Sequence, residues 1–162
     1  MKHILRALIL CTAVQGGVAL AAGPQAPASE AAAGYKVIRA EFGLLDFKKA
    51  GPPKFAPAQV VPHVTGQGYG WVIAIRNTKS KVKWREEITL PARPASWGAA
   101  DPKGVRFISR DGLTAVTEIE DSPPRGVISN AWTIAAGDPK GHYVIRVFID
   151  GTLAKVFEFD VK

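Results

Sequence analysis

Four basic residues recur at every second position of one short segment. They are Lys79, Lys81, Lys83 and Arg85, and we call them the basic stripe. Side chains two positions apart in a β-strand share a face, so the four would project together while Val82 and Trp84 face a core. Two interpretations stay open. Either the stripe is a solvated face or protects an edge strand from edge-to-edge pairing, or it binds an anionic partner, with Arg76 adding to the field.

Trp97 differs from the other tryptophans of the mature chain in its surroundings. Trp71, Trp84 and Trp132 lie among valine and isoleucine in predicted strands, which is typical of core packing. Trp97 lies in a loop, in the sequence Arg-Pro-Ala-Ser-Trp-Gly. It either folds back over the core or serves as an exposed anchor for a sugar or peptide. We therefore include it among the candidate binding residues.

Residues that hold metal ions or perform acid–base catalysis are sparse and badly spaced. His63 and His142 lack the short spacing of a prebuilt metal site, so we expect both to be isolated and solvent-facing. Glu118 and Glu120 share a strand face about 7 Å apart, but they end a strand and we expect them to be solvated. Glu86, next to another glutamate, must point away from it across the strand. We predict no metal and no cofactor.

Neither nucleophilic catalysis nor phosphate binding has a recognisable motif in the chain. There is no Gly-x-Ser-x-Gly and no serine close in sequence to a histidine. The glycines at 66, 68 and 70 have the wrong spacing for a dinucleotide loop and precede a strand; they suit a bulge or a tight start of that strand. We predict a non-enzyme. One alternative to this prediction is an envelope hydrolase. Its active site would gather His63 or His142 with Glu118, Glu120 or Asp121.

The first 21 residues have the layout of a secretory signal peptide. Lys2 and Arg6 precede an apolar run, and Ala19-Leu20-Ala21 is a small-x-small cleavage site. An uncleaved anchor is the alternative. Cleavage after Ala21 removes the single cysteine and leaves 19 basic residues against 14 acidic ones, which lowers the net charge from +7 to +5. Residues 22–34, rich in alanine and proline, then form a flexible tether, and the protein is predicted to be periplasmic or secreted.

From Tyr35 to the C-terminus the apolar residues alternate with period two between turn residues. The clearest pattern is a hairpin of 143–149 and 153–161 around Asp150-Gly151, with Leu153, Phe157, Phe159 and Val161 on one face. Further hairpins are predicted from 71–76 with 82–90 and from 105–109 with 113–119, and 51–57 is predicted to be a loop. About seven short strands predict an all-β fold over residues 35–162, an antiparallel immunoglobulin-like β-sandwich.

Three segments of this domain resemble a bacterial family of unknown function, number 3859. They are the opening Arg39-Ala-Glu-Phe-Gly-Leu-Leu, the central Gly68-Tyr-Gly-Trp-Val-Ile, and the closing stretch from Gly141-His-Tyr-Val-Ile to Phe-Glu-Phe-Asp-Val. The resemblance implies a small immunoglobulin-like sandwich and brings no catalytic residues with it.

The sequence therefore predicts an exported, non-catalytic binding or accessory module of the cell envelope. Residues 35–93 hold 11 basic and 4 acidic residues, so the first hypothesis is electrostatic recognition of an anionic envelope component through the basic stripe. In an exported protein such a partner is not nucleic acid. The alternative is an assembly accessory that pairs with another envelope protein through a sheet edge.

Overall fold

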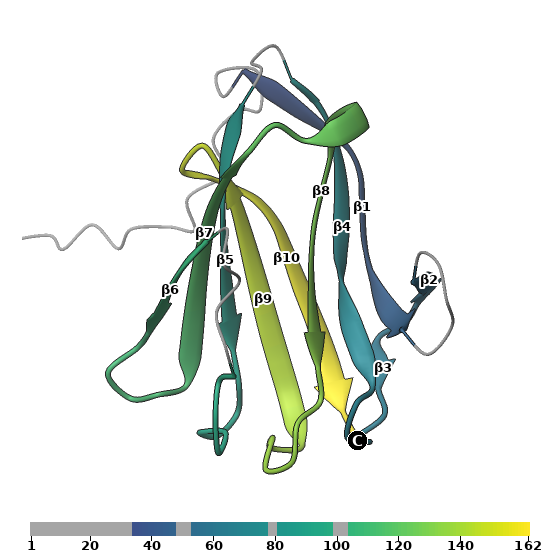
Figure 1. Cartoon of the computed structure of the whole chain (residues 1–162), viewed down its shortest axis with the longest axis vertical. Helices are drawn as coiled ribbons and strands as arrows, with labels where there is room; N and C mark the ends of the chain where they lie inside the picture. Colours follow the sequence, from purple (N-terminus) through teal and green to yellow (C-terminus); the bar gives the residue numbers. More distant parts are fainter. Residues whose placement is uncertain (1–33, 48–52, 78–80, 99–103) are drawn as a thin grey trace, which may run out of the picture.

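Two β-sheets packed face to face make up the protein (Figure 1). The computed structural model describes residues 34–47, 53–77, 81–98 and 104–162. The predicted signal peptide, and the tether up to residue 33, lie outside these residues. In the described part of the chain, no helix has the length and apolar character needed to cross a membrane.

The first sheet is antiparallel, with the strand order β2-β1-β4-β8. Its strands are β1 (Tyr35–Asp46), β2 (Lys54–Pro57), β4 (Gly68–Asn77) and β8 (Val127–Thr133). A short 3-10 turn, η2 (Pro124–Gly126), leads into β8. The loop predicted at 51–57 is wrong in part, because residues 54–57 pair with the end of β1 as β2.

The second sheet has the order β3-β10-β9-β5-β7-β6. Its strands are β3 (Val60–Val61), β5 (Val82–Thr89), β6 (Val105–Ile108), β7 (Thr114–Asp121), β9 (Gly141–Ile149) and β10 (Thr152–Val161). All its pairs are antiparallel except that of β3 with β10. The prediction of an all-β sandwich is confirmed.

The core lies between the sheets and is built by the predicted alternation. On β9 the side chains of Tyr143, Ile145, Val147 and Ile149 are fully buried. The Phe42 ring of the first sheet stacks on Phe159 of the second, with 4.2 Å between the centroids. Burial of each such side chain contributes about 1.5–3 kcal/mol, so these inward faces hold the two sheets together.

The C-terminal hairpin is confirmed, with one correction. Asp150 and Gly151 have φ of 48° and 83°, the positive values that a tight two-residue turn requires. The register shifts between Leu153 and Lys155, so an extra residue bulges out of β10 and reverses which side chains face inward. Leu153 therefore lies on the outer face, 39% exposed, whereas Phe157 is buried as predicted.

The hairpin predicted from 71–76 and 82–90 is wrong. Both segments are strands, β4 and β5, but β4 pairs with β1 and β8, whereas β5 pairs with β7 and β9. The chain crosses from one sheet to the other between them. The hairpin of β6 and β7 is confirmed.

Candidate functional site

The basic stripe lies on the outer face of the second sheet, but not at an edge. Lys81, Lys83 and Arg85 alternate with buried residues as predicted, while Lys79 lies outside the described residues. Lys83 and Arg85 belong to β5 and Lys81 directly precedes it. This strand runs between β9 and β7 in the interior of the sheet. The interpretation of the stripe as edge protection is therefore wrong.

Carboxylates of the neighbouring strand β7 offset the charge of the stripe. Lys81 Nζ lies 3.3 Å from Glu120 Oε1, and Lys83 Nζ lies 2.9 Å from Glu118 Oε2. Arg76, proposed to add to the field, is exposed on β4 of the other sheet. Because it alternates there with buried residues, its side chain points outward from the first sheet, on the side of the sandwich opposite to the basic stripe. The structure therefore does not gather these cations into one positively charged surface.

Arg85 has both a charged and an aromatic partner. Its Nη2 lies 3.0 Å from Glu87 Oε1, and its guanidinium stands over the Phe148 ring, 4.3 Å from the centroid. Glu118 and Glu120 alternate in the sequence at the same period as the lysines that they contact. That period is the only sign of the pairing in the sequence, which does not specify that β5 and β7 are neighbours.

Trp97 folds back against the core. Its side chain is half-buried, and its Nε1 donates a hydrogen bond to the Gly112 carbonyl oxygen at 3.1 Å. The ring meets Trp132 edge to face, at 6.1 Å between centroids and an interplanar angle of 70°. The structure thus places Trp97 apart from the basic stripe, and beside a tryptophan that belongs to β8.

Trp97 also lines a cleft of about 290 Å³. The end of β8, Arg106 of β6 and the segments around Trp97 and Asp138 surround this cleft. Its lining also includes the aromatic and aliphatic side chains of Phe47, Tyr69, Leu90 and Trp132 and the charged side chains of Arg106 and Asp138. Arg106 Nη1 donates to the Trp97 carbonyl oxygen at 2.9 Å, and its guanidinium lies 4.7 Å from the centre of the Trp132 ring. The cleft therefore has aromatic walls and two charged groups of opposite sign.

A buried carboxylate holds one wall of this cleft. Glu86 of β5 points into the sandwich and has no exposed surface. Its Oε1 accepts hydrogen bonds from Trp132 Nε1 at 2.8 Å and Asn130 Nδ2 at 3.0 Å, and its Oε2 accepts one from Trp71 Nε1. Burial raises the pKa of Glu86, although these hydrogen bonds oppose the shift.

Sequence reasoning placed Glu86 and Glu87 on opposite faces, which is confirmed, but it missed the role of Glu86. The alternation of buried and exposed positions along β5 does contain a sign of this role. Glu86 occupies an inward position between Trp84 and Ile88, where a strand of this type normally carries an apolar residue. A carboxylate there must have hydrogen-bond donors, and the two indoles across the sandwich supply them.

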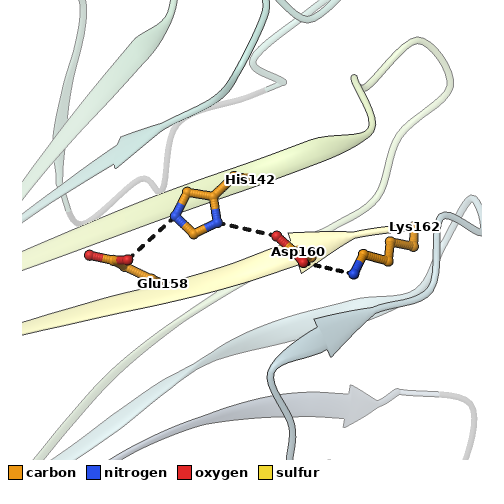
Figure 2. Close-up of polar contacts among 4 residues, drawn as sticks. All are labelled: His142, Glu158, Asp160 and Lys162. Atoms are coloured by element: carbon orange, nitrogen blue, oxygen red, sulfur yellow. Dashed lines mark hydrogen bonds and ion pairs between the residues drawn. The ribbon is translucent and has the colours of Figure 1, made fainter.

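A second polar cluster lies on the outer face of the C-terminal hairpin (Figure 2). His142 Nε2 lies 3.4 Å from Glu158 Oε2, and its Nδ1 lies 3.2 Å from Asp160 Oδ1. Lys162 Nζ lies 2.8 Å from Asp160 Oδ2. The hydrogen bonds from Lys162 and His142 lower the pKa of Asp160. His142 is exposed as predicted but not isolated.

The described residues do not assemble the acid–base set of the hydrolase hypothesis. His63 Nε2 lies 2.8 Å from the Asp138 carbonyl oxygen. Glu118 is opposite Arg85, which is opposite Phe148. His142 lies six positions before Phe148 on β9, roughly 20 Å away along the strand. Among these residues no group of three histidine, cysteine or acidic side chains is placed to hold a metal ion.

The sequence matches the family described as the PM0630 beta sandwich domain over residues 40–162. The chain belongs to this family. The membership agrees with the predicted small β-sandwich family, but it does not specify the family of unknown function 3859, which stays a prediction. No curated protein matches the sequence.

Solved structures with a similar fold include an immunoglobulin-like protein from Pseudomonas aeruginosa. It aligns with a TM-score of 0.53 and 16% identity, over 79% of this chain and 96% of that one. An alkylpurine DNA glycosylase from Pseudomonas fluorescens aligns with a TM-score of 0.46 and 13% identity, over 80% of this chain and 31% of that one. The PmoD soluble domain from a Methylocystis species aligns with a TM-score of 0.43 and 17% identity, over 78% and 96%. The first of these shows the immunoglobulin-like fold.

Proposed function

We propose that the protein is an exported, non-catalytic accessory module that pairs with an extended segment of another envelope protein along strand β6. The observation that carries the proposal is the composition of this strand. Val105, Phe107 and Ile108 are 55%, 56% and 44% exposed, and β6 is the last strand of its sheet in the part of the chain that the structure describes. An exposed apolar edge strand is a template for pairing with another chain.

Strand β6 lacks the residues that commonly prevent pairing at an edge strand. Its sequence, Val-Arg-Phe-Ile, has no proline or lysine, and its one charged side chain, Arg106, turns inward over Trp132. The edge strand β2 is protected by contrast, because it carries Lys54 and Pro57. Of these two edges, the one at β6 is therefore the better place for a partner strand.

The register of β6 and β7 indicates what the partner strand would carry. Phe107 is opposite Val116, so the outer face of this edge is apolar at its centre. A partner strand with apolar residues at alternate positions would extend that face, since side chains on one face of neighbouring strands pack against each other. The basic stripe supports this role less well, because carboxylates lie beside its described residues.

Export rests on the signal-like pattern of residues 1–21. Its test is the mass of the protein recovered from cells. The expected N-terminus is Ala22, and a protein that retains Met1 in the cytoplasm would contradict export while leaving edge pairing to its own test.

Photo-crosslinking in cells of the source bacterium tests the pairing. A photoreactive phenylalanine at position 107 is expected to form a crosslink to one extended segment of another envelope protein, which peptide mass spectrometry identifies. Phe148 is the matched control position: it lies on the outer face of the same sheet, and its strand β9 pairs with β5 and β10 at that residue. A crosslink only to a second copy of this chain, or equal crosslinking from 107 and 148, would contradict the proposal.

A further inference from the structure

The cleft lined by Trp97 and Trp132 is a separate site from the strand edge proposed above, although the inward-turned Arg106 of β6 also lines it. We propose that it binds one neutral sugar ring of an envelope glycan. The two indole rings lie edge to face, 6.1 Å apart, and both are half-buried, so part of each ring is open to the cleft. The C–H face of a pyranose ring is apolar and packs against an aromatic ring, while its hydroxyls stay at the rim.

The charged groups of the lining favour a neutral ligand. Arg106 and Asp138 both line the cleft, so a cation meets the guanidinium and an anion meets the carboxylate. Hydroxyl groups both donate and accept hydrogen bonds, and carboxylate and guanidinium groups therefore suit them together. A neutral sugar ring can therefore pack its C–H face against the indole rings and form hydrogen bonds with Arg106 and Asp138 through its hydroxyls.

The two indoles are held in place by hydrogen bonds inside the protein. Trp132 Nε1 donates to the buried Glu86 carboxyl at 2.8 Å, and Trp97 Nε1 donates to the Gly112 carbonyl oxygen at 3.1 Å. Arg106 joins them, because it donates to the Trp97 carbonyl oxygen and stands over one face of the Trp132 ring. A surface fixed before the ligand arrives loses little conformational entropy on binding.

The size of the cleft limits the ligand to a single ring. Its volume of about 290 Å³ lies at the lower end of the range of small-molecule pockets. Small exposed side chains, Ser96 and Thr133, also line the cleft, and their hydroxyls add hydrogen-bonding groups at the rim. The site therefore suits one residue of a longer glycan, with the neighbouring sugars in solvent.

Titration of the protein with chitohexaose, a neutral oligosaccharide, tests the proposal by ¹H–¹⁵N spectroscopy. The four tryptophans give four indole N–H signals. Those of Trp97 and Trp132 are expected to move in a saturable way, while that of Trp84, 3% exposed in the core, stays in place. Deacetylated chitohexaose, which is cationic, and hexagalacturonate, which is anionic, are expected to bind about tenfold more weakly.

A variant pair separates the cleft from general surface binding. Trp97→Ala is expected to weaken chitohexaose binding about tenfold through the lost ring contact. Phe148→Ala removes a half-buried ring on the outer face of the second sheet, and its affinity should equal that of the wild type. If Trp97→Ala does not fold, the comparison of indole signals in the wild type still decides.

Three results would overturn the proposal. The first is no movement of the Trp97 and Trp132 signals up to about 10 mM chitohexaose, well above the dissociation constant of a weak site of ~1 mM. The second is equal movement of the Trp84 signal. The third is tighter binding of either charged oligosaccharide. None of these results bears on strand pairing at β6, so the two proposals fail separately.

Discussion

Glu86 is a fully buried acidic residue that accepts hydrogen bonds from the opposite sheet. Three N–H groups donate to its two oxygens from β4 and β8, whereas Glu86 itself belongs to β5 of the other sheet. Its hydrogen bonds therefore join the two sheets and orient Trp132 in the wall of the cleft. An unpaired buried donor costs about 1–3 kcal/mol, so the carboxyl cannot be removed without leaving several donors unsatisfied.

Replacement of Glu86 by glutamine is expected to lower the free energy of unfolding by about 1–3 kcal/mol. The amide has one acceptor oxygen, so its NH₂ group must face at least one of the N–H donors on Trp71, Trp132 and Asn130. Urea unfolding measures the effect. Glu87→Gln is the control: it alters only a surface ion pair with Arg85 and should cost less than about 1 kcal/mol. Equal costs for the two variants would contradict the role of Glu86.

The same carboxyl makes stability depend on pH. Burial raises the pKa of Glu86 in the folded chain above its ordinary value near 4.5, so the folded state binds this proton more tightly than the unfolded state. The stabilising contribution is then complete below about pH 4.5 and falls as the pH rises through the raised pKa. Urea unfolding of wild type and Glu86→Gln from pH 4.5 to 8 should show the wild type losing part of its advantage. An advantage that grows with pH would contradict this sign.

At the scale of the element, two glycines are required for different reasons: one for its backbone conformation and the other for the close approach of two strands. Gly151 ends the hairpin turn at φ 83°, with open space around the position of a Cβ. At Gly70 of β4, a Cβ would lie 2.2 Å from the Asn130 carbonyl oxygen of β8. The first position constrains only the backbone conformation, and the second constrains the distance between two paired strands.

Alanine is therefore expected to cost different amounts at these positions. Gly151→Ala should lower the free energy of unfolding by about 1–2 kcal/mol, the cost of a left-handed conformation with a side chain. Gly70→Ala should cost about 3 kcal/mol or more, because backbone of the neighbouring strand must move. Thermal unfolding of both variants measures the order, and a larger loss for Gly151→Ala would contradict it.

At this scale, the sequence correctly predicted the pairing of strands that a tight turn connects. Alternation and the Asp150-Gly151 turn were enough for the C-terminal hairpin, because its two strands are adjacent in the chain. The hairpin predicted from β4 and β5 failed because a short polar connection does not specify whether its strands pair or cross between sheets. Leu153 was assigned to the wrong face because the bulge after it leaves no mark in the alternation.

At the scale of the whole molecule, the candidate surfaces depend on contacts between distant segments. The basic stripe is evident in sequence, but the carboxylates beside it belong to β7, which the chain reaches only after β6. The cleft combines β8, β6 and the segment around Trp97, and its buried Glu86 comes from a fourth element. No pattern in the sequence specifies these neighbours, so the stripe was predicted as the main binding surface and the cleft was not predicted.

Charge reversal on the stripe distinguishes the two candidate faces of the molecule. Lys81→Glu combined with Lys83→Glu places glutamates beside Glu120 and Glu118, which should cost less than about 1 kcal/mol for each exposed pair. Crosslinking from position 107 to the envelope partner is expected to stay unchanged, because β6 makes the contact. Loss of that crosslink in a folded double variant would return the stripe to the binding surface.

Hydrogen exchange at the edge strands β6 and β2 tests the central claim most directly. The probe is a synthetic peptide with the sequence of the segment that crosslinks to position 107, added to the full chain. The amides of β6, at residues 105–108, should exchange more slowly in the complex, because the peptide accepts and donates hydrogen bonds along that edge. The amides of β2, at the edge guarded by Lys54 and Pro57, should exchange at their original rate. Unchanged exchange in β6, with peptide bound, would contradict the claim that this protein recruits its partner as an added strand.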